Sequence, residues 1–255
     1  MRVNVVSDVH GRSDALRGAA DGADALLCLG DLLLFIDYAD HGQGIFPDLF
    51  GAAAASELIA LRTAGRFDEA RALSGRLWAG LGGDPRQHID AAVARQYADL
   101  FAAMPVPAYL TYGNVDVPRL WADHLRPGHQ VLDGERVELG GWTFGFVGGG
   151  LRSPYRTPNE LDEDVFAAKV AAVGEVDVLC AHIPPDVPEL LFDTVARRME
   201  TGSAALLAAI ERTQPRYALF GHVHQPQSGR VRIGATECVN VGHFRATGQP
   251  FTLEW

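Results

Sequence analysis

The chain has 255 residues, of which 47% are hydrophobic and 21% are charged, and its formal net charge at pH 7 is −10. This length suits one domain of generous size, or a domain with a large insertion, and the apolar share supports a buried core. The acidic balance, with Lys169 as the single lysine, argues against an extended nucleic-acid surface. A protein this acidic that acted on phosphate would need positive charge from bound metal ions.

Membrane and disulfide signals are absent from the sequence. No stretch approaches the ~20 uninterrupted apolar residues that a membrane helix needs. The first six residues lead directly into a strand-like pattern without the shape of a signal peptide, so we expect a cytoplasmic protein with no membrane partner. An odd number of cysteines without regular spacing, each inside an apolar run, argues against disulfides and predicts buried free thiols: Cys28, Cys180 and Cys238.

The first third of the chain alternates apolar runs with turn-like and helical segments. The pattern predicts a strand at 3–6, a turn at 8–11, a helix from Ser13 to Gly22 with Ser13 as its cap, and a buried strand at 25–29. Two buried strands joined by a helix are typical of a parallel βαβ unit.

Residues 32–104 differ from their surroundings. Three alanine-rich segments, at 51–64, 67–81 and 87–103, have helical periodicity and are separated by Gly and Pro. We interpret 32–104 as a helical insertion that caps one end of the sheet, within a single domain formed by residues 1–255. Its weakly charged character fits a small substrate or the contact of a homodimer, and the sequence leaves both open.

The rest of the chain returns to alternating strands and helices. Helices are expected at 161–173 and 202–213, and strands at 106–111, 142–147, 176–180, 217–220, 230–233, 236–241 and 251–254. Because there is neither an internal repeat nor a low-complexity linker, we predict one α/β domain (α+β by some schemes) with an inserted helical cap.

Short polar clusters follow five of the predicted strands at their carboxyl ends. Because this edge of an open α/β sheet is where ligands bind, we expect the clusters to converge there. The clusters are Asp8-Val9-His10, Gly30-Asp31, Gly113-Asn114, His182 and Gly221-His222-Val223-His224.

The residue types in these clusters indicate a metal site. Carboxylate, imidazole and amide ligands suit Mn, Fe, Zn and similar divalent ions, and no cysteine is present to favour a softer metal. One intervening residue, Val9 or Val223, lets the two flanking side chains point the same way from an extended backbone. Each fragment alone also fits a surface turn, and it is the ordered set after successive strands that favours metal binding.

Together the five clusters resemble the motifs of the calcineurin-like metallophosphoesterase family, and they span residues 8–224. The resemblance implies a double β-sandwich flanked by helices and two divalent metal ions, with Mn favoured and Fe, Zn or Ni as alternatives. It implies that one ion is held by Asp8, His10, Asp31 and His224. The second ion would be held by Asp31, Asn114, His182 and His222, so that Asp31 bridges the pair.

Such a metal pair implies a hydrolase that acts on phosphate esters. Two ions ~3.5–4 Å apart acidify a bridging water, and the resulting hydroxide attacks phosphorus in line with the leaving oxygen. The ions also neutralise the charge that develops on the phosphoryl oxygens. The expected substrate is a small phosphodiester or phosphomonoester, with diesters favoured.

The third motif departs from the family pattern. Much of the family has Gly-Asn-His-Asp, whose His is thought to protonate the leaving group, whereas this chain has Gly113-Asn114-Val115-Asp116. Valine cannot donate a proton, so this role is either absent or filled by another residue. Asp116 matches the family Asp that orients the missing His, and its role stays open between catalysis and an N-cap before Pro118.

Three residues are candidates for the missing role. His243 lies in a segment, 240–243, where many relatives have an Asn-Pro-Gly-Ser loop near the metals. His41 opens the helical insertion, and Arg152 follows a triple glycine from which it could grip a phosphate oxygen. The alternatives are a structural or surface histidine for His243, a solvated loop for His41 and a surface salt bridge for Arg152. The residues to which we assign catalytic roles are Asn114, His243 and Asp116.

The missing general acid also affects the expected substrate. General acid catalysis typically contributes about 10²–10⁴-fold, so a metal pair without it copes best with good leaving groups. The sequence therefore predicts slow turnover of alkyl phosphates and useful activity on aryl phosphodiesters. Two other functions stay in view. One is a non-catalytic binding scaffold, although scaffolds usually lose ligands that this chain keeps, and the other is a protein phosphatase, which generally keeps the His that Val115 replaces.

Overall fold

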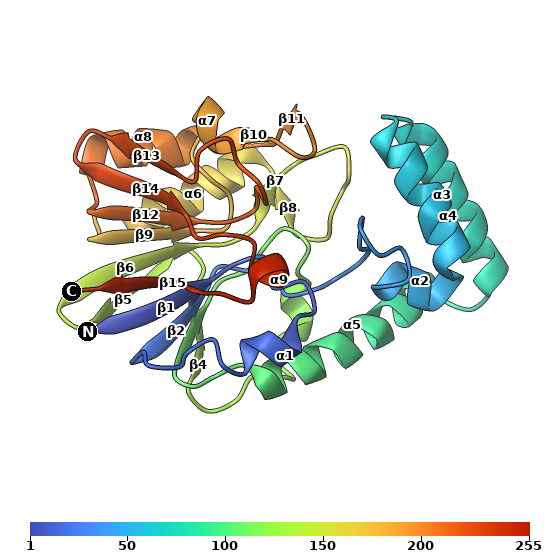
Figure 1. The fold of residues 1–255 in the computed structure, drawn as a ribbon, viewed down its shortest axis with the longest axis horizontal. Helices are drawn as coiled ribbons and strands as arrows, with labels where there is room; N and C mark the ends of the chain where they lie inside the picture. The colour runs from blue at the N-terminus through green and yellow to red at the C-terminus, as the bar shows by residue number, and fades with distance from the viewer.

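Two β-sheets pack face to face between layers of helices in the computed structural model, which describes residues 1–255 (Figure 1). The first sheet has the strand order β15-β1-β2-β3-β4. Strands β1 to β4 run parallel, and β15 is antiparallel to β1. The bounds are β1 (Arg2–Val6), β2 (Ala25–Cys28), β3 (Ala108–Leu110), β4 (His129–Val131) and β15 (Phe251–Glu254).

The second sheet has the strand order β13-β14-β12-β9-β6-β5. Its four central strands are parallel and its two edge strands are antiparallel to their neighbours. The bounds are β5 (Glu135–Leu139), β6 (Trp142–Val147), β9 (Val178–Ala181), β12 (Tyr217–Phe220), β13 (Arg230–Ile233) and β14 (Thr236–Asn240). Two short pairs are separate from both sheets: β7 (Gly150–Leu151) with β8 (Glu160–Leu161), and β10 (Phe192–Asp193) with β11 (Arg198–Met199).

The sheets bury their facing sides against each other. Val3 and Val5, which alternate along β1, share one apolar cluster with Phe144 and Phe146 of β6, as the period of two in a strand requires. The predicted double sandwich is therefore confirmed. The three cysteines are free and buried in the strands, as the sequence predicts: Cys28 in β2, Cys180 in β9 and Cys238 in β14.

Helices cover the outer face of each sheet. Helices α1 (Ser13–Leu16) and α5 (Pro85–Ala103) contribute to the apolar cluster outside the first sheet, and α6 (Glu163–Val173) and α8 (Ala204–Thr213) to the cluster outside the second. None of the helices combines the length and apolar character needed to cross a membrane. Three short helices lie in connecting loops: η1 (Pro118–Leu120), α7 (Pro188–Leu191) and α9 (Phe244–Thr247).

The segment 32–104 has a part that projects and a part that belongs to the body. Helices α2 (Ile45–Phe50), α3 (Ala52–Thr63) and α4 (Phe67–Leu81) extend away from the sandwich, whereas α5 returns beneath the first sheet (Figure 1). The α3–α4 hairpin has a small apolar core of its own. Its turn also touches the body, because the ring of Phe67 lies 5.4 Å from that of Tyr155, centroid to centroid.

One local prediction was wrong, and several elements were not predicted. The helix predicted from Ser13 to Gly22 ends at Leu16, and Ser13 is its first residue rather than its cap. Beyond Leu16 the chain forms tight turns, in one of which the Asn4 amide donates to the Ala19 carbonyl at 3.0 Å. Helix α2, which contains a proline, and the half-exposed strands β4 and β5 lack the patterns used for prediction.

We expect Phe101→Ala to lower the free energy of unfolding by about 3–5 kcal/mol, because the substitution leaves a large cavity in the core. Phe101 is 1% exposed and packs against Tyr97 and Trp121. Urea unfolding followed by circular dichroism measures the loss. Leu81→Ala, in an exposed position at the end of α4, is the control and should change stability by less than about 0.5 kcal/mol. If Phe101→Ala lowered the free energy of unfolding as little as Leu81→Ala does, α5 would lie outside the core.

Candidate metal centre

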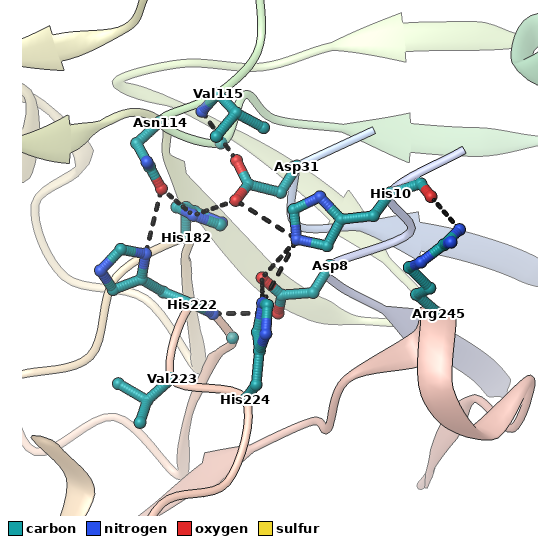
Figure 2. Close-up of polar contacts among 12 residues, drawn as sticks. Asp8, His10, Asp31, Asn114, Val115, His182, His222, Val223, His224 and Arg245 are labelled. Atoms are coloured by element: carbon teal, nitrogen blue, oxygen red, sulfur yellow. Dashed lines mark hydrogen bonds and ion pairs between the residues drawn. The ribbon is translucent and has the colours of Figure 1, made fainter. Parts of the chain in front are cut away.

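Five loops at the carboxyl ends of β1, β2, β3, β9 and β12 bring the predicted ligands into one cluster (Figure 2). The cluster is formed where the two sheets meet at one rim, so each sheet supplies part of it. Four of the seven side chains are buried, namely Asp8, Asp31, Asn114 and His182, and the other three are half-buried.

One side of the cluster is formed by Asp8, His10 and His224. Nε2 of His224 lies 3.5 Å from Oδ1 of Asp8, and it lies 3.2 Å from Nε2 of His10. Nε2 of His10 is also 3.8 Å from Oδ2 of Asp31. These side chains point toward a common centre (Figure 2).

The other side is formed by Asn114, His182 and His222. Oδ1 of Asn114 lies 2.9 Å from Nε2 of His182 and 3.0 Å from Nδ1 of His222. Nε2 of His182 is 3.4 Å from Oδ2 of Asp31. The same carboxylate oxygen of Asp31 therefore faces both sides of the cluster, which is the geometry expected of a bridging ligand.

The backbone at these loops is strained. Four of the predicted ligands have the positive φ angles that side-chain-bearing residues rarely adopt: Asp8 (57°), His10 (41°), Asp31 (54°) and His222 (68°). Gly30 allows two ligand loops to meet, because a Cβ there would lie 2.0 Å from the backbone nitrogen of Gly113. Strain of this kind persists only where surrounding contacts impose it, and it concentrates at functional sites.

Backbone groups orient the ligand side chains. Nδ1 of His10 faces the Leu33 carbonyl at 2.8 Å, and Nδ1 of His182 faces the Leu29 carbonyl at 2.9 Å, which leaves Nε2 of each ring directed into the cluster. The Val115 backbone N–H donates to Oδ1 of Asp31 at 2.9 Å. Position 115 thus supports Asp31 through its backbone N–H rather than through its side chain.

Asp116 lies behind the ligand loops and does not face the cluster. Its buried carboxylate accepts hydrogen bonds from the backbone N–H groups of Asp31 (2.9 Å), Leu32 (3.1 Å) and Gly113 (2.8 Å). Burial and the nearby Asp31 raise the pKa of Asp116 to about 7. The N-cap alternative is wrong, because Val117 precedes η1 without any side-chain cap. The contacts of Asp116 are those of a residue that positions the loops of Asp31 and Asn114.

The three candidates for the missing proton donor lie in different surroundings. The ring of His243 stacks on that of His224, with centroids 3.8 Å apart, and neither of its nitrogens has a hydrogen-bond partner. His41 instead lies 2.8 Å from the Ser56 hydroxyl of α3, and Arg152 forms an exposed ion pair with Asp162. Only His243 lies beside the predicted ligands.

Sequence reasoning missed residues that contact the ligands from outside the motifs. The Thr157 hydroxyl accepts from the Asn114 amide at 2.9 Å. Arg245 donates to the His10 carbonyl at 2.8 Å (Figure 2). Arg245 also forms an ion pair with Asp37. Thr157 lies in a loop and Arg245 in the short helix α9, neither with a distinctive spacing, so no pattern in the sequence could have identified them.

Charge in the cluster is balanced between carboxylates and imidazoles. Burial alone would lower the pKa of His182, but Asp31 raises it to about 9. Burial alone would raise the pKa values of Asp8 and Asp31, and the surrounding histidines hold both below their ordinary range. Burial and the neighbouring His182 lower the pKa of His222 to about 4. A protonated His182 thus supplies positive charge to the two carboxylates.

These residues fit a pair of divalent cations. Oδ1 of Asp8 is buried without a hydrogen-bond partner, although it faces the cluster. Three overlapping sets of donor atoms each lie within 4.8 Å of one another: Asp8, His10 and Asp31; Asp31, His182 and His222; and His10, His224 and His243. Oxygen and imidazole donors without thiolate suit Mn, Fe, Zn and related ions.

The double sandwich with an Asp/His/Asn cluster at its rim is the arrangement of a metallophosphoesterase. A family model for calcineurin-like phosphoesterases matches residues 1–226, and the chain belongs to this family. A comparison with curated proteins gives no match.

Solved structures show the same fold. One crystal structure matches with a TM-score of 0.61 at 17% identity, over 95% of this chain and 91% of that one. The crystal structure of TT1561 of Thermus thermophilus matches with a TM-score of 0.54 at 14% identity, over 99% of this chain and 98% of that one.

We expect the affinity for Mn²⁺ to rise with pH between about 6 and 8. In the metal-free protein His182 is protonated below its pKa of about 9, and a cation can bind its Nε2 only after that proton leaves. Release of one proton predicts about a tenfold gain in affinity per pH unit. Calorimetry in buffers of different ionisation enthalpy measures both the affinity and the protons released. His88→Gln, a change at a histidine that bonds locally to the Gly82 carbonyl, should keep the slope. An affinity independent of pH would contradict the expectation.

Proposed function

We propose that the chain is a metal-dependent phosphoesterase that hydrolyses phosphodiesters, and phosphomonoesters less well, with two divalent cations. The observation that supports this most is the position of Asp31. Its Oδ2 lies 3.8 Å from Nε2 of His10 and 3.4 Å from Nε2 of His182, between the two groups of ligands. In this proposal the first ion is held by Asp8, His10, Asp31 and His224, and the second by Asp31, Asn114, His182 and His222.

When bound, the cations would supply the positive charge that acidifies a water molecule and neutralises the phosphoryl oxygens. The residues of the chain hold the reacting groups in place. Asp116 and the Val115 N–H fix the Asp31 loop, and the Leu33 and Leu29 carbonyls fix the imidazoles of His10 and His182. The carboxylate, imidazole and amide donors suit Mn, Fe and Zn alike, and we propose Mn as the first of these to test. The three free thiols suit the reducing cytoplasm as the place of action.

His243 is the residue that we propose contacts the leaving group. Both of its ring nitrogens lack partners, and its ring lies against His224 and 5.8 Å from that of His10, centroid to centroid. An imidazole N–H there can donate a hydrogen bond to an ester oxygen of a substrate. His41 and Arg152 are engaged elsewhere and do not enter the proposal.

The helical insertion contacts both sides of the proposed site. At its beginning, Asp37 pairs with Arg245, which also bonds the His10 carbonyl. At the α3–α4 turn, Phe67 and Arg62 pack on Tyr155, in the loop whose Thr157 bonds Asn114. We propose that the insertion limits the space above the cations, so that the substrate is a small phosphorylated molecule. A non-catalytic scaffold is less well supported, because each of the seven ligand positions has a residue that can bind a cation.

We expect the purified protein to bind two Mn²⁺ per chain and to hydrolyse bis-p-nitrophenyl phosphate. Asp31→Asn weakens the bridging position, so metal content should fall to one ion or fewer and turnover by more than about 10²-fold, consistent with the loss of metal-based catalysis. Elemental analysis and an absorbance assay measure the two quantities. Asp68→Asn, a change in an exposed ion pair on α4, is the matched control and should behave as wild type. A fully loaded protein without turnover on a broad panel of esters would support the scaffold instead.

We expect aryl phosphodiesters to be cleaved much faster than alkyl phosphates, because position 115 has no proton donor. Val115→His should raise turnover of alkyl esters by about 10-fold or more and change aryl turnover little, as general acid catalysis serves poor leaving groups. His243→Ala should lower turnover of alkyl esters further. Steady-state rates on a series of esters graded by the pKa of the leaving group test this. Equal wild-type rates across the series, with chemistry rate-limiting, would be the contrary result.

A further inference from the structure

The Asn114 side chain has two similar ends, and only one of them can serve a cation. Its Oδ1 is an acceptor and a metal ligand, whereas its Nδ2 is a donor that a cation repels. In the structure Oδ1 faces His182 and His222, at 2.9 and 3.0 Å, and Nδ2 points the opposite way. A histidine that donates to Oδ1 also selects this end, but a histidine nitrogen that binds a cation has no proton to donate. With a cation bound, the group at Nδ2 must therefore keep Oδ1 facing the cluster.

That group is found in the loop between β7 and β8. Nδ2 of Asn114 donates to the Thr157 hydroxyl oxygen at 2.9 Å, and the same hydroxyl donates to Oε1 of Glu160 at 2.9 Å. A hydroxyl has one proton, and an ionised carboxylate can only accept. Because the Thr157 proton is committed to Glu160, the Thr157 oxygen is left to accept, and it can accept only from the nitrogen end of Asn114.

The loop is held firmly enough to impose this choice. The Glu160 carboxylate also accepts from the Ser153 N–H at 2.9 Å, the Ser153 hydroxyl at 2.5 Å and the Thr157 N–H at 3.0 Å. Asn159 joins this loop to the loop after β3, since its N–H donates to the Asn114 carbonyl at 2.9 Å and its amide to the Gly113 carbonyl at 3.0 Å. The loop and the ligand are thus parts of one hydrogen-bonded unit.

We infer that Thr157 and Glu160 are positioning residues that set the polarity of the Asn114 amide and thereby the affinity of the second cation. The inference rests on the proposed function, because it needs a cation at Asn114. The order of donation runs from Asn114 through Thr157 to Glu160, so each member is required for the next. Partners of this kind behind a ligand typically contribute about 10- to 100-fold to metal affinity.

Thr157→Val tests the inference, because valine keeps the shape of threonine and removes the oxygen that accepts from Asn114. We expect the affinity for the second Mn²⁺ to fall about 10- to 100-fold while the first site keeps its affinity. Calorimetry measures the two affinities, and electron paramagnetic resonance should show isolated Mn²⁺ in place of a coupled pair at two equivalents. Thr157→Ser restores the hydroxyl and should bind both ions within about threefold of wild type, given the usual scatter of such effects.

Ser153→Ala is the matched control, because Ser153 donates to the same carboxylate but has no bond to Asn114. It should bind both ions as wild type does. Unchanged affinities in Thr157→Val would overturn the inference, and so would equal losses in Thr157→Ser or Ser153→Ala, which would indicate a general role in loop folding. If the wild-type protein binds two ions and hydrolyses the ester, and Thr157→Val binds metal equally well, only this inference is overturned. A wild-type protein that binds no metal overturns both proposals.

Discussion

The Asp31 carboxylate is the group on which the rest of the site depends. It is buried between imidazoles of both ligand groups, and its φ of 54° is held by hydrogen bonds that Asp116 accepts from the backbone N–H groups of Asp31 and Leu32. A buried carboxylate is costly unless positive charge compensates it. Without metal, the compensation comes from His182, whose pKa Asp31 raises. The fold thus assembles a charge balance that a divalent cation can take over, and the ends of strands from both sheets are needed to build it.

The loop between β7 and β8 connects this centre with the helical insertion. Thr157, near one end of the loop, bonds the Asn114 amide, and Tyr155, two residues earlier, packs against Phe67 of the α3–α4 turn. Arg198 of the β10–β11 hairpin lies on the same tyrosine ring, with its guanidinium carbon 5.1 Å from the centroid. A shift of either the α3–α4 hairpin or the β10–β11 hairpin would therefore act on Tyr155, which is two residues from the Thr157 that bonds Asn114. This gives the insertion a physical route to influence the site without supplying a ligand itself.

Much of the fold and the ligand cluster could be predicted from the sequence, because both rest on local patterns. Buried parallel strands are continuous apolar runs in the sequence, and their carboxyl ends lie at one rim of the sheet. A polar motif that follows such a run, such as Gly30-Asp31, is therefore expected at that rim. The remainder depends on contacts between distant segments. After helix α1 ends at Leu16, the chain turns so that its Ala19 carbonyl meets Asn4 of a separate strand. The Asp116 carboxylate accepts from three backbone N–H groups, two of them in another ligand loop. Thr157, in a loop, and Arg245, in the short helix α9, lie in unpatterned segments that only the tertiary fold brings to the ligands.

Position 115 shows that the backbone and the side chain of one residue can have separate roles. Its backbone N–H donates to Asp31 at 2.9 Å, a contact that any residue except proline can make. The side chain is a separate matter, and the valine packs with the apolar cluster around α5. The structural role of the motif is therefore independent of its chemical role, and the first can persist when the second is lost. If the cluster holds metal as we propose, a site with these ligands and their supports but without this donor would suit esters whose leaving groups depart without a proton. In our proposal His243, whose two buried ring nitrogens have no hydrogen-bond partner beside His224, moderates that preference.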